Sequence, residues 1–185
     1  MSIDREIIEE IDDGNVYLQK ISESDAKFLY NSLQKEEIIR YMSLNSVPSL
    51  NHAKSLIKRH LIYWEKYQQF NYTIKVKERT SFRPVGSTSL WNLDWNNNRA
   101  EVGIWIIPSL WGEGFGKRAL KLVKIAAFMH LNLNRLAAHI VTKNQRSLKL
   151  FLKSGFEKEG ILKDYLKLNG KYYDVFVVAA LGPDF

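Results

Sequence analysis

The fold is decided by one stretch of the sequence, Ile104-Trp105-Ile106-Ile107-Pro108-Ser109-Leu110-Trp111-Gly112-Glu113-Gly114-Phe115-Gly116, where an apolar run ends at a proline and three glycines follow at alternate positions. The apolar run predicts a strand, and the spacing of apolar residues after the glycines predicts a helix. Glycine amides at a helix N-terminus, together with the positive end of the helix dipole, suit a phosphate group. The stretch therefore predicts a strand, turn and helix that bind phosphate, although the same glycines could form a tight turn alone.

Basic residues concentrate directly after this stretch. No Asp or Glu lies between Glu113 and Glu157, and this segment holds nine of the 27 Lys and Arg residues: Lys117, Arg118, Lys121, Lys124, Arg135, Lys143, Arg146, Lys149 and Lys153. Without these nine, 18 basic residues face 20 acidic residues, so the segment carries the whole positive excess. Positive charge confined to one segment favours a local anion site, and a phosphorylated cofactor is the leading hypothesis.

Two common phosphate-binding motifs do not fit this stretch. A Walker A loop that ends at Gly116-Lys117 requires glycine in place of Trp111 and Ser or Thr in place of Arg118. The dinucleotide fingerprint requires glycine in place of Lys117 and an acidic residue about 20 positions later, inside the segment that has none.

The composition, with 45% hydrophobic and 25% charged residues, is that of a folded soluble protein. We expect a single domain over residues 1–185, with residues 1–14 as an N-terminal extension or edge strand. No apolar run approaches the ~20 residues that cross a bilayer, and the acidic N-terminus does not resemble a secretory signal. The absence of cysteine excludes disulfides and thiolate sites, and the four histidines show no ligand spacing. We therefore expect a cytoplasmic protein without a metal site or membrane contact.

On the N-terminal side, the hydrophobic pattern predicts two helices among strands. A helix from Ala26 follows a capping box at Ser22 and Asp25, and a second runs from Ser49 or Asn51 to about Gln68. The predicted strands are Val16–Ile21, Tyr72–Val76, Val85–Trp91 and Ala100–Ile107, with turns at Arg83-Pro84 and Asp94–Asn98.

On the C-terminal side, the helix after the glycines is followed by a strand over Arg135–Val141 and a helix over Asn144–Ser154 that Gly155 ends. Two further strands, Gly160–Leu168 and Tyr172–Leu181, flank Asn169-Gly170, a strong type I′ hairpin signal. The order predicts one mixed α/β (α+β) domain: an antiparallel meander, a β-α-β crossover, a helix and a closing hairpin.

Two motifs together resemble a known family. The opening stretch resembles the acetyl-CoA signature of the GNAT N-acetyltransferase superfamily. The second motif, Asn144–Gly160, has the pattern N-x-x-S…K-x-G-F-x-x-E-G and is similar to the RimJ/RimL branch, which acetylates the N-termini of ribosomal proteins, and to spermidine acetyltransferases. The resemblance covers about Val16 to Leu181. It implies a mostly antiparallel central sheet, flanked by helices and splayed at the site of an acetyl-CoA cosubstrate.

The resemblance also implies where acetyl-CoA binds. The pantetheine would lie along the backbone of Ile104, Trp105 and Ile106 like an added strand. The pyrophosphate would contact the amides of the loop residues Trp111, Gly112, Glu113, Gly114, Phe115 and Gly116. Lys117 would lie beside the pyrophosphate. Asn144 would bind the pantetheine or cap its own helix. Phe151 stands where many members of the family have a tyrosine, so it would contact the cofactor through packing.

Acetyl transfer requires a neutral amine and a way to release the thiolate. At pH 7 about a tenth of an α-amine is neutral, against about one lysine amine in two thousand. Glu101 is the candidate base, directly or through water, because it lies on the strand that leads to the thioester; the alternative is a strand carboxylate paired with Arg99. Since Phe151 has no proton to donate, Ser147 is the candidate hydroxyl at the leaving thiolate, with solvent water as the alternative.

The function expected from the resemblance is acetylation of a primary amine by direct attack in a ternary complex. A protein or peptide N-terminus, such as that of a ribosomal protein, is the favoured acceptor. The alternatives are a small-molecule amine or polyamine, a non-catalytic CoA-binding protein, and an RNA-binding protein. Nucleic acid is expected only as an incidental contact, and the sequence leaves the oligomeric state open.

Overall fold

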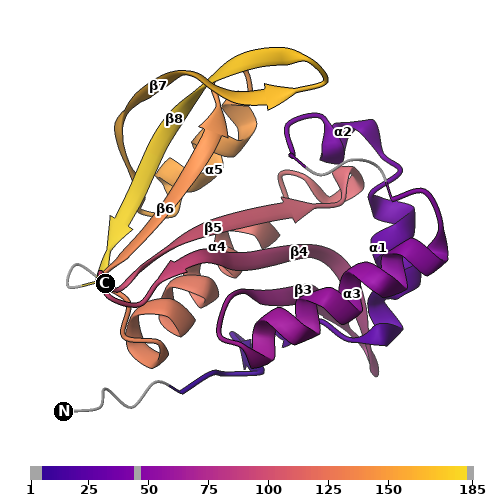
Figure 1. The fold of residues 1–185 in the computed structure, drawn as a ribbon. Helices are drawn as coiled ribbons and strands as arrows, with labels where there is room; N and C mark the ends of the chain where they lie inside the picture. Colours follow the sequence, from indigo (N-terminus) through magenta and orange to yellow (C-terminus); the bar gives the residue numbers. More distant parts are fainter. Residues whose placement is uncertain (1–5, 44–46, 183–185) are drawn as a thin grey trace.

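The computed structural model describes residues 6–43 and 47–182 and contains one eight-stranded sheet (Figure 1). Residues 1–5, the start of the predicted N-terminal extension, lie outside the described residues. The sheet order is β1-β2-β3-β4-β5-β6-β8-β7, and every neighbouring pair is antiparallel except β5 and β6. The strands are β1 (Glu10–Asp12), β2 (Val16–Lys20), β3 (Phe70–Glu78), β4 (Ser81–Asp94), β5 (Arg99–Ile106), β6 (Arg135–Val141), β7 (Glu157–Leu168) and β8 (Lys171–Leu181).

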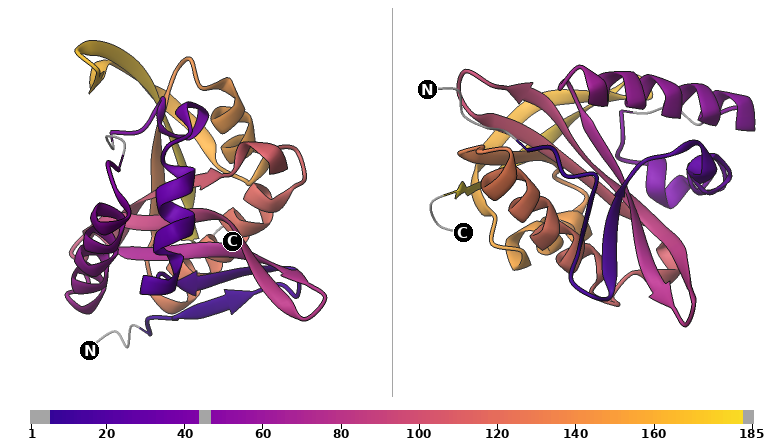
Figure 2. Two further views of the ribbon diagram at one scale, coloured as in Figure 1. Left: turned by 90° about the vertical axis from the view of Figure 1, so that its right-hand side faces the viewer. Right: turned by 90° about the horizontal axis from the view of Figure 1, so that it is seen from below.

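Helices cover both faces of the sheet. They are α1 (Ala26–Ser32), α2 (Glu36–Ile39), α3 (Leu50–Glu65), α4 (Phe115–Ile125) and α5 (Gln145–Lys153), with 3₁₀ turns η1 (Glu23–Asp25) and η2 (Pro108–Leu110) and a π-helical segment η3 (Ala126–His130). Seen from below, α3 and α4 lie on opposite sides of the sheet (Figure 2). This arrangement confirms the predicted mixed α/β class with a mostly antiparallel sheet. Within the described ranges, no helix has both the length and the apolar character needed to span a membrane.

Local signals in the sequence predicted several turns and caps correctly, whereas strands β3, β4 and β7 are longer than predicted. Asn169 and Gly170 both have positive φ, as a type I′ turn requires, and they join β7 to β8. Gly155 has φ of 79° directly after α5. Ser22 and Asp25 form the predicted capping box.

The turn predicted at Arg83-Pro84 is wrong. Both residues lie inside β4, and the chain reverses earlier, between Glu78 and Ser81. Pro84 is tolerated in the strand because it lies where the β3–β4 register shifts and beyond the end of the β4–β5 pairing at Gly86. A proline has no N–H to donate, so irregular pairing of this kind suits it.

Of the three hydrophobic cores that the described residues form, the two larger lie on opposite faces of the sheet. Apolar residues at helical spacing in α4, including Leu120 and Val123, pack against Val102 and Ile106 of β5. On the other face, Leu56 and Ile57 of α3 form a second cluster, against which Trp105 of β5 packs. Alternate residues of β5 therefore anchor it from both sides.

The sheet opens between β5 and β6. Only three parallel pairs join them, Arg99 with Arg135, Ala100 with Leu136 and Glu101 with Ala137. Beyond Glu101, β5 stays paired with β4, while β6 stays paired with β8 as far as Val141. Figure 1 shows the two strands starting side by side and diverging toward α2. The structure thus confirms the predicted splay.

Gly86 allows β4 to approach the divergent end of β5. A Cβ atom at Gly86 would lie 2.2 Å from the carbonyl oxygen of Trp105 and 2.8 Å from the Ile106 side chain. We expect Gly86→Ala to lower the free energy of unfolding by about 1–3 kcal/mol, the usual cost of overpacking, as measured by urea denaturation.

Gly160→Ala in β7 is the matched control, because nothing lies within 4 Å of a Cβ atom there. We expect it to change stability by no more than about 0.5 kcal/mol. Equal effects of the two substitutions would contradict the proposed role of Gly86.

Candidate active site

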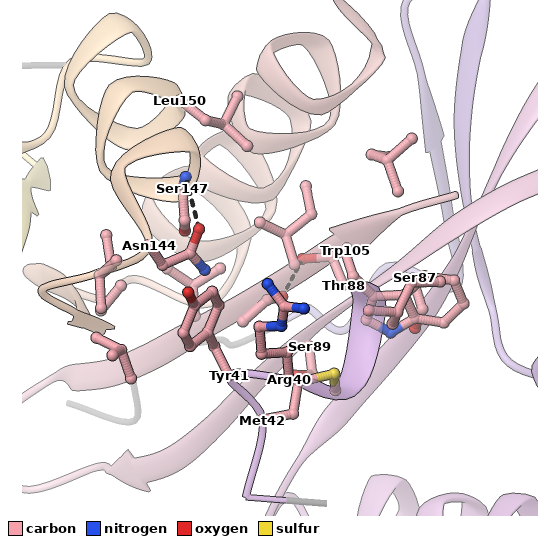
Figure 3. Close-up of a pocket in the computed structure, with 18 of the residues that line it drawn as sticks. Arg40, Tyr41, Met42, Ser87, Thr88, Ser89, Trp105, Asn144, Ser147 and Leu150 are labelled. Atoms are coloured by element: carbon pink, nitrogen blue, oxygen red, sulfur yellow. Dashed lines mark hydrogen bonds between the residues drawn. The ribbon is translucent and has the colours of Figure 1, made fainter. Parts of the chain in front are cut away.

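The opening between β5 and β6 leads into a cavity of about 680 Å³ (Figure 3). Its walls come from α1, α2, α3, β3, β4, β5, β6 and α5. Glu37 is the one carboxylate among the lining residues that the structure describes, whereas Arg40, Lys143 and Arg146 are basic. The cavity therefore reaches from α5 and Trp111 to α1 and α3 on the opposite face of the sheet, and its wall is basic rather than acidic.

One wall is the edge of β5 that β6 leaves unpaired. Ile104, Trp105 and Ile106, the residues predicted to contact pantetheine, all line the cavity. The Ile106 carbonyl accepts a 2.8 Å hydrogen bond from the Trp111 indole, and the Trp105 ring stacks on Phe28 of α1 at 5.7 Å. An unpaired strand edge can bind an extended ligand through backbone hydrogen bonds.

The glycine loop adopts a conformation suited to its residues. Gly112 and Gly114 have φ of 93° and 84°, in the left-handed region that favours glycine, and α4 begins directly afterwards. The Trp111 amide donates to the Pro108 carbonyl within the preceding turn. The Arg146 guanidinium lies over the indole of Trp111, 3.6 Å from its ring centre, in a cation–π contact. Trp111 thus anchors the loop to both β5 and α5.

The basic residues after the loop do not all face it. Arg118 makes two 2.8 Å hydrogen bonds to the Asp13 carboxylate, and Arg135 pairs with Glu159. Lys117, in the first turn of α4, is exposed. Of the first two basic residues after the glycines, Lys117 is therefore the one available for a ligand of this loop.

Helix α5 brings three predicted residues to the cavity. The Asn144 side-chain oxygen accepts a hydrogen bond from the Ser147 amide at 3.2 Å, so Asn144 is the N-cap of α5. An amide also carries N–H donors, so this cap does not prevent contact with a ligand. Phe151 is buried and packs edge-to-face on Phe156. Figure 3 shows the Tyr41 ring directed toward Asn144. Tyr41 thus brings a second hydroxyl, besides that of Ser147, to the cavity wall, and it was not predicted from the sequence.

Glu101 is held between two strands. One carboxylate oxygen accepts a 2.8 Å hydrogen bond from Asn92, and the other lies 2.9 Å from His139 Nδ1. Arg99, the partner considered from the sequence, pairs with Asp94 instead. Burial raises the pKa of Glu101, but the hydrogen bonds from His139 and Asn92 outweigh burial, and the pKa is lowered. Glu101 is thus ionised at neutral pH.

His139 was not predicted as a site residue. It lines the cavity, and its ring stacks on Tyr165 of β7 at 4.9 Å. Because an ionised carboxylate only accepts hydrogen bonds, Nδ1 carries the proton in the neutral ring, which leaves the lone pair on Nε2. His139 could have been predicted only from the sheet register. Glu101 pairs with Ala137, so residue 139 falls on the same face as Glu101.

A metal role is not indicated by the side chains. Over the ranges 6–43 and 47–182, no group of three or more His, Asp or Glu residues is arranged to hold a metal ion.

Comparisons with known proteins agree with this geometry. Residues 15–157 match the model of the acetyltransferase (GNAT) domain family. The N-acetyltransferase YoaA of Bacillus subtilis is 29% identical over 173 residues, which cover 94% of this chain and 97% of YoaA.

Two solved structures have the same fold. Spermidine N-acetyltransferase from Vibrio cholerae, in complex with CoA and spermine, has a TM-score of 0.81 at 22% identity and covers 92% of this chain and 98% of its own. Mycobacterium smegmatis RimJ, in complex with CoA-disulfide, has a TM-score of 0.83 at 20% identity and covers 91% and 83%. With the family match over most of its length and this sheet architecture, the chain belongs to the GNAT acetyltransferase family.

Proposed function

We propose that this acetyltransferase transfers the acetyl group of acetyl-CoA to the N-terminal α-amine of a protein, such as a ribosomal protein, by direct attack in a ternary complex. The observation that carries the proposal is that the unpaired edge of β5 and the Glu101–His139 pair border one opening in the sheet. A thioester along that edge and an amine beside the imidazole would meet there.

The residues present fit acetyl-CoA. Gly112 and Gly114 leave open space where a side chain would project, so the loop amides are accessible, and Lys117 adds a positive charge at the N-terminus of α4. The edge from Ile104 to Ile106 would hold the pantetheine, and Asn144 would donate to it from its amide nitrogen. When bound, acetyl-CoA supplies an activated acetyl group; the chain holds it, orients the amine and moves protons.

The base in this proposal is a pair of residues. His139 Nε2 accepts a proton from the amine, and Glu101 holds the imidazole through Nδ1 and stabilises the charged ring. Asn92 fixes the other oxygen of Glu101. Glu101, predicted as the base itself, would act through His139. Ser147, in the first turn of α5, is the proposed hydroxyl that assists release of the thiolate.

The charges of the cavity favour a peptide N-terminus over a polyamine. A polycation is normally bound by several carboxylates, and Glu37 is the one carboxylate lining the described cavity. An α-amine is also partly neutral at pH 7, so a single histidine suffices as its base. The structures of similar fold include both a spermidine acetyltransferase and RimJ, so the charge of the cavity is what supports a peptide acceptor in this proposal.

An acceptor screen tests the function. With acetyl-CoA, we expect kcat/KM for short N-terminal peptides to exceed that for spermidine at least about tenfold, measured as thiol release. For an α-amine the rate should rise with pH up to about 8 and then level off, because its pKa is near 7.7–8.0. A rate that climbs toward pH 10, or a preference for spermidine, would identify a different amine.

Binding of CoA tests the loop. We expect Lys117→Ala to raise the Kd for CoA about fivefold, or ~1 kcal/mol, by titration calorimetry. Arg118→Ala is the matched control, since Arg118 pairs with Asp13, and should change the Kd less than about twofold. Equal effects of the two variants, or no CoA binding by the unaltered protein, would refute this cofactor site.

Proton transfer is tested by single and double variants. We expect His139→Asn to lower kcat/KM about 10²-fold or more, and Glu101→Gln to do so by a similar factor. Since the two residues act as a unit, the double variant should be no worse than His139→Asn alone.

Asn92→Ala, which keeps the Glu101–His139 contact, is the control and should cost less than about threefold in kcat/KM. Additive losses, or an unchanged pH–rate profile in Glu101→Gln, would remove Glu101 from the mechanism. In the same assay Ser147→Ala should lower kcat about tenfold, and full turnover would discard the serine.

A further inference from the structure

Two buried polar atoms in the cavity wall have no hydrogen-bond partner. Among the buried side-chain nitrogens and oxygens that the structure describes, these are Nδ1 of His60 and Nδ2 of Asn71. The residues come from different elements, α3 and β3, yet both line the same cavity. Since buried polar groups in folded proteins are almost always paired, with protein groups or with bound molecules, two such groups on one cavity wall mark a place where a polar ligand can pair.

Asn71 lines the cavity and carries a hydrogen-bond donor that has no partner. Its side chain is almost fully buried, with 4% exposed, and its Oδ1 accepts a 3.0 Å hydrogen bond from Gln69 Nε2. That bond occupies the oxygen and leaves the NH₂ group facing a partner still to be supplied. Gln69 also lines the cavity. The group that completes Asn71 is therefore a hydrogen-bond acceptor, such as a carbonyl oxygen.

Two other polar residues that line the cavity, His60 and Ser89, are uncharged at neutral pH. Burial, with a smaller contribution from Arg59, lowers the pKa of His60 to about 4, so its ring is neutral at pH 7. Ser89 is the strand neighbour of Asn71 and also lines the cavity. Amide, imidazole and hydroxyl groups together suit a neutral polar ligand and do not attract an ammonium group as carboxylates would.

The sheet register gives the distance from Asn71 to the opening. Asn71 pairs with Ser89, and Ser89 pairs with Gly103 of β5. Adjacent strands lie about 4.8 Å apart, so Asn71 is roughly 10 Å from Gly103. His139 stands at the position opposite Gly103 across the opening, two residues beyond the last pair. An amine in the opening between Gly103 and His139 is therefore roughly 10–14 Å from Asn71, which corresponds to three or four residues of an extended peptide at about 3.3 Å per residue.

We propose that Asn71, oriented by Gln69 and lining the same cavity as His60, forms a specificity subsite that binds a carbonyl oxygen near the third residue of an extended peptide N-terminus. This assignment names a recognition element for the acceptor and rests on the function proposed above. It also explains how the site would reject polyamines, which offer donors but no carbonyl to Asn71.

Paired substrates and variants test the subsite. The substrates are trialanine amide and octylamine, which is of similar length and has no carbonyl group. We expect Asn71→Ala to lower kcat/KM for the tripeptide amide about tenfold and that for octylamine less than twofold. Asn71→Asp, which replaces the donor with an acceptor, should lower it further for the tripeptide amide and raise it for spermidine. Asn71→Ser keeps a shorter donor and serves in place of Asn71→Ala if that variant does not fold.

Thr73→Ala is the matched control, because Thr73 is a buried polar residue of the same strand that does not line the cavity. It should leave both substrates within twofold. Equal losses for both substrates in Asn71→Ala, or no loss for the tripeptide amide, would overturn the subsite.

Calorimetric titration with trialanine amide, without acetyl-CoA, separates this proposal from the proposed function. We expect Asn71→Ala to weaken peptide binding about tenfold. If that loss is seen but no acetyl transfer occurs, the subsite stands and the proposed function fails. If acetyl transfer occurs but Asn71→Ala changes neither peptide binding nor kcat/KM, the proposed function stands and the subsite fails.

Discussion

The site depends on the end of pairing between β5 and β6 after three residues. Each strand keeps its other partner, β4 for β5 and β8 for β6, so the backbone hydrogen bonds on that side remain where β5 and β6 diverge. The cost of an unpaired edge is therefore limited to the inner backbone groups of β5 and β6, where an extended ligand can pair. Gly86 and the Trp111 indole hold the end of β5 at this position.

The divergence of β5 and β6 also places the predicted cofactor-binding and acceptor-binding residues on different sides of the opening. Helices α4 and α5, with the glycine loop, stand on one side of the opening, whereas α1, α3 and the polar residues of β3 and β4 stand on the other. The Glu101–His139 pair lies at the vertex, where the strands are still close enough for one side chain to reach the next strand. An imidazole held by an ionised carboxylate is costly to bury, and the second bond from Asn92 helps to offset that cost.

The parts of the fold that follow from local chemistry could be predicted from the sequence. Asn169-Gly170 and the glycines before α4 specify their own backbone conformation, and the apolar spacing of α4 specifies its buried face. The turn predicted at Pro84 was wrong because proline indicates a turn unless the tertiary structure provides a bulge in which it can lie. His139 and Asn71 have no local signal. Their roles come from strand register, which joins residues 38 positions apart in the case of Glu101 and His139.

Asn71 and His60 are a case where stability and binding oppose each other. Each unpaired buried group costs about 1–3 kcal/mol, a notable share of the 5–15 kcal/mol that stabilises a typical domain. An apolar side chain at either position would remove the cost, and α3 already carries the apolar neighbour Ile57 one turn before His60. The cost falls on residues that line the cavity beside the strand that opens. A ligand that accepts a hydrogen bond from Asn71 would offset this cost on binding, so the group that lowers stability would contribute to selectivity.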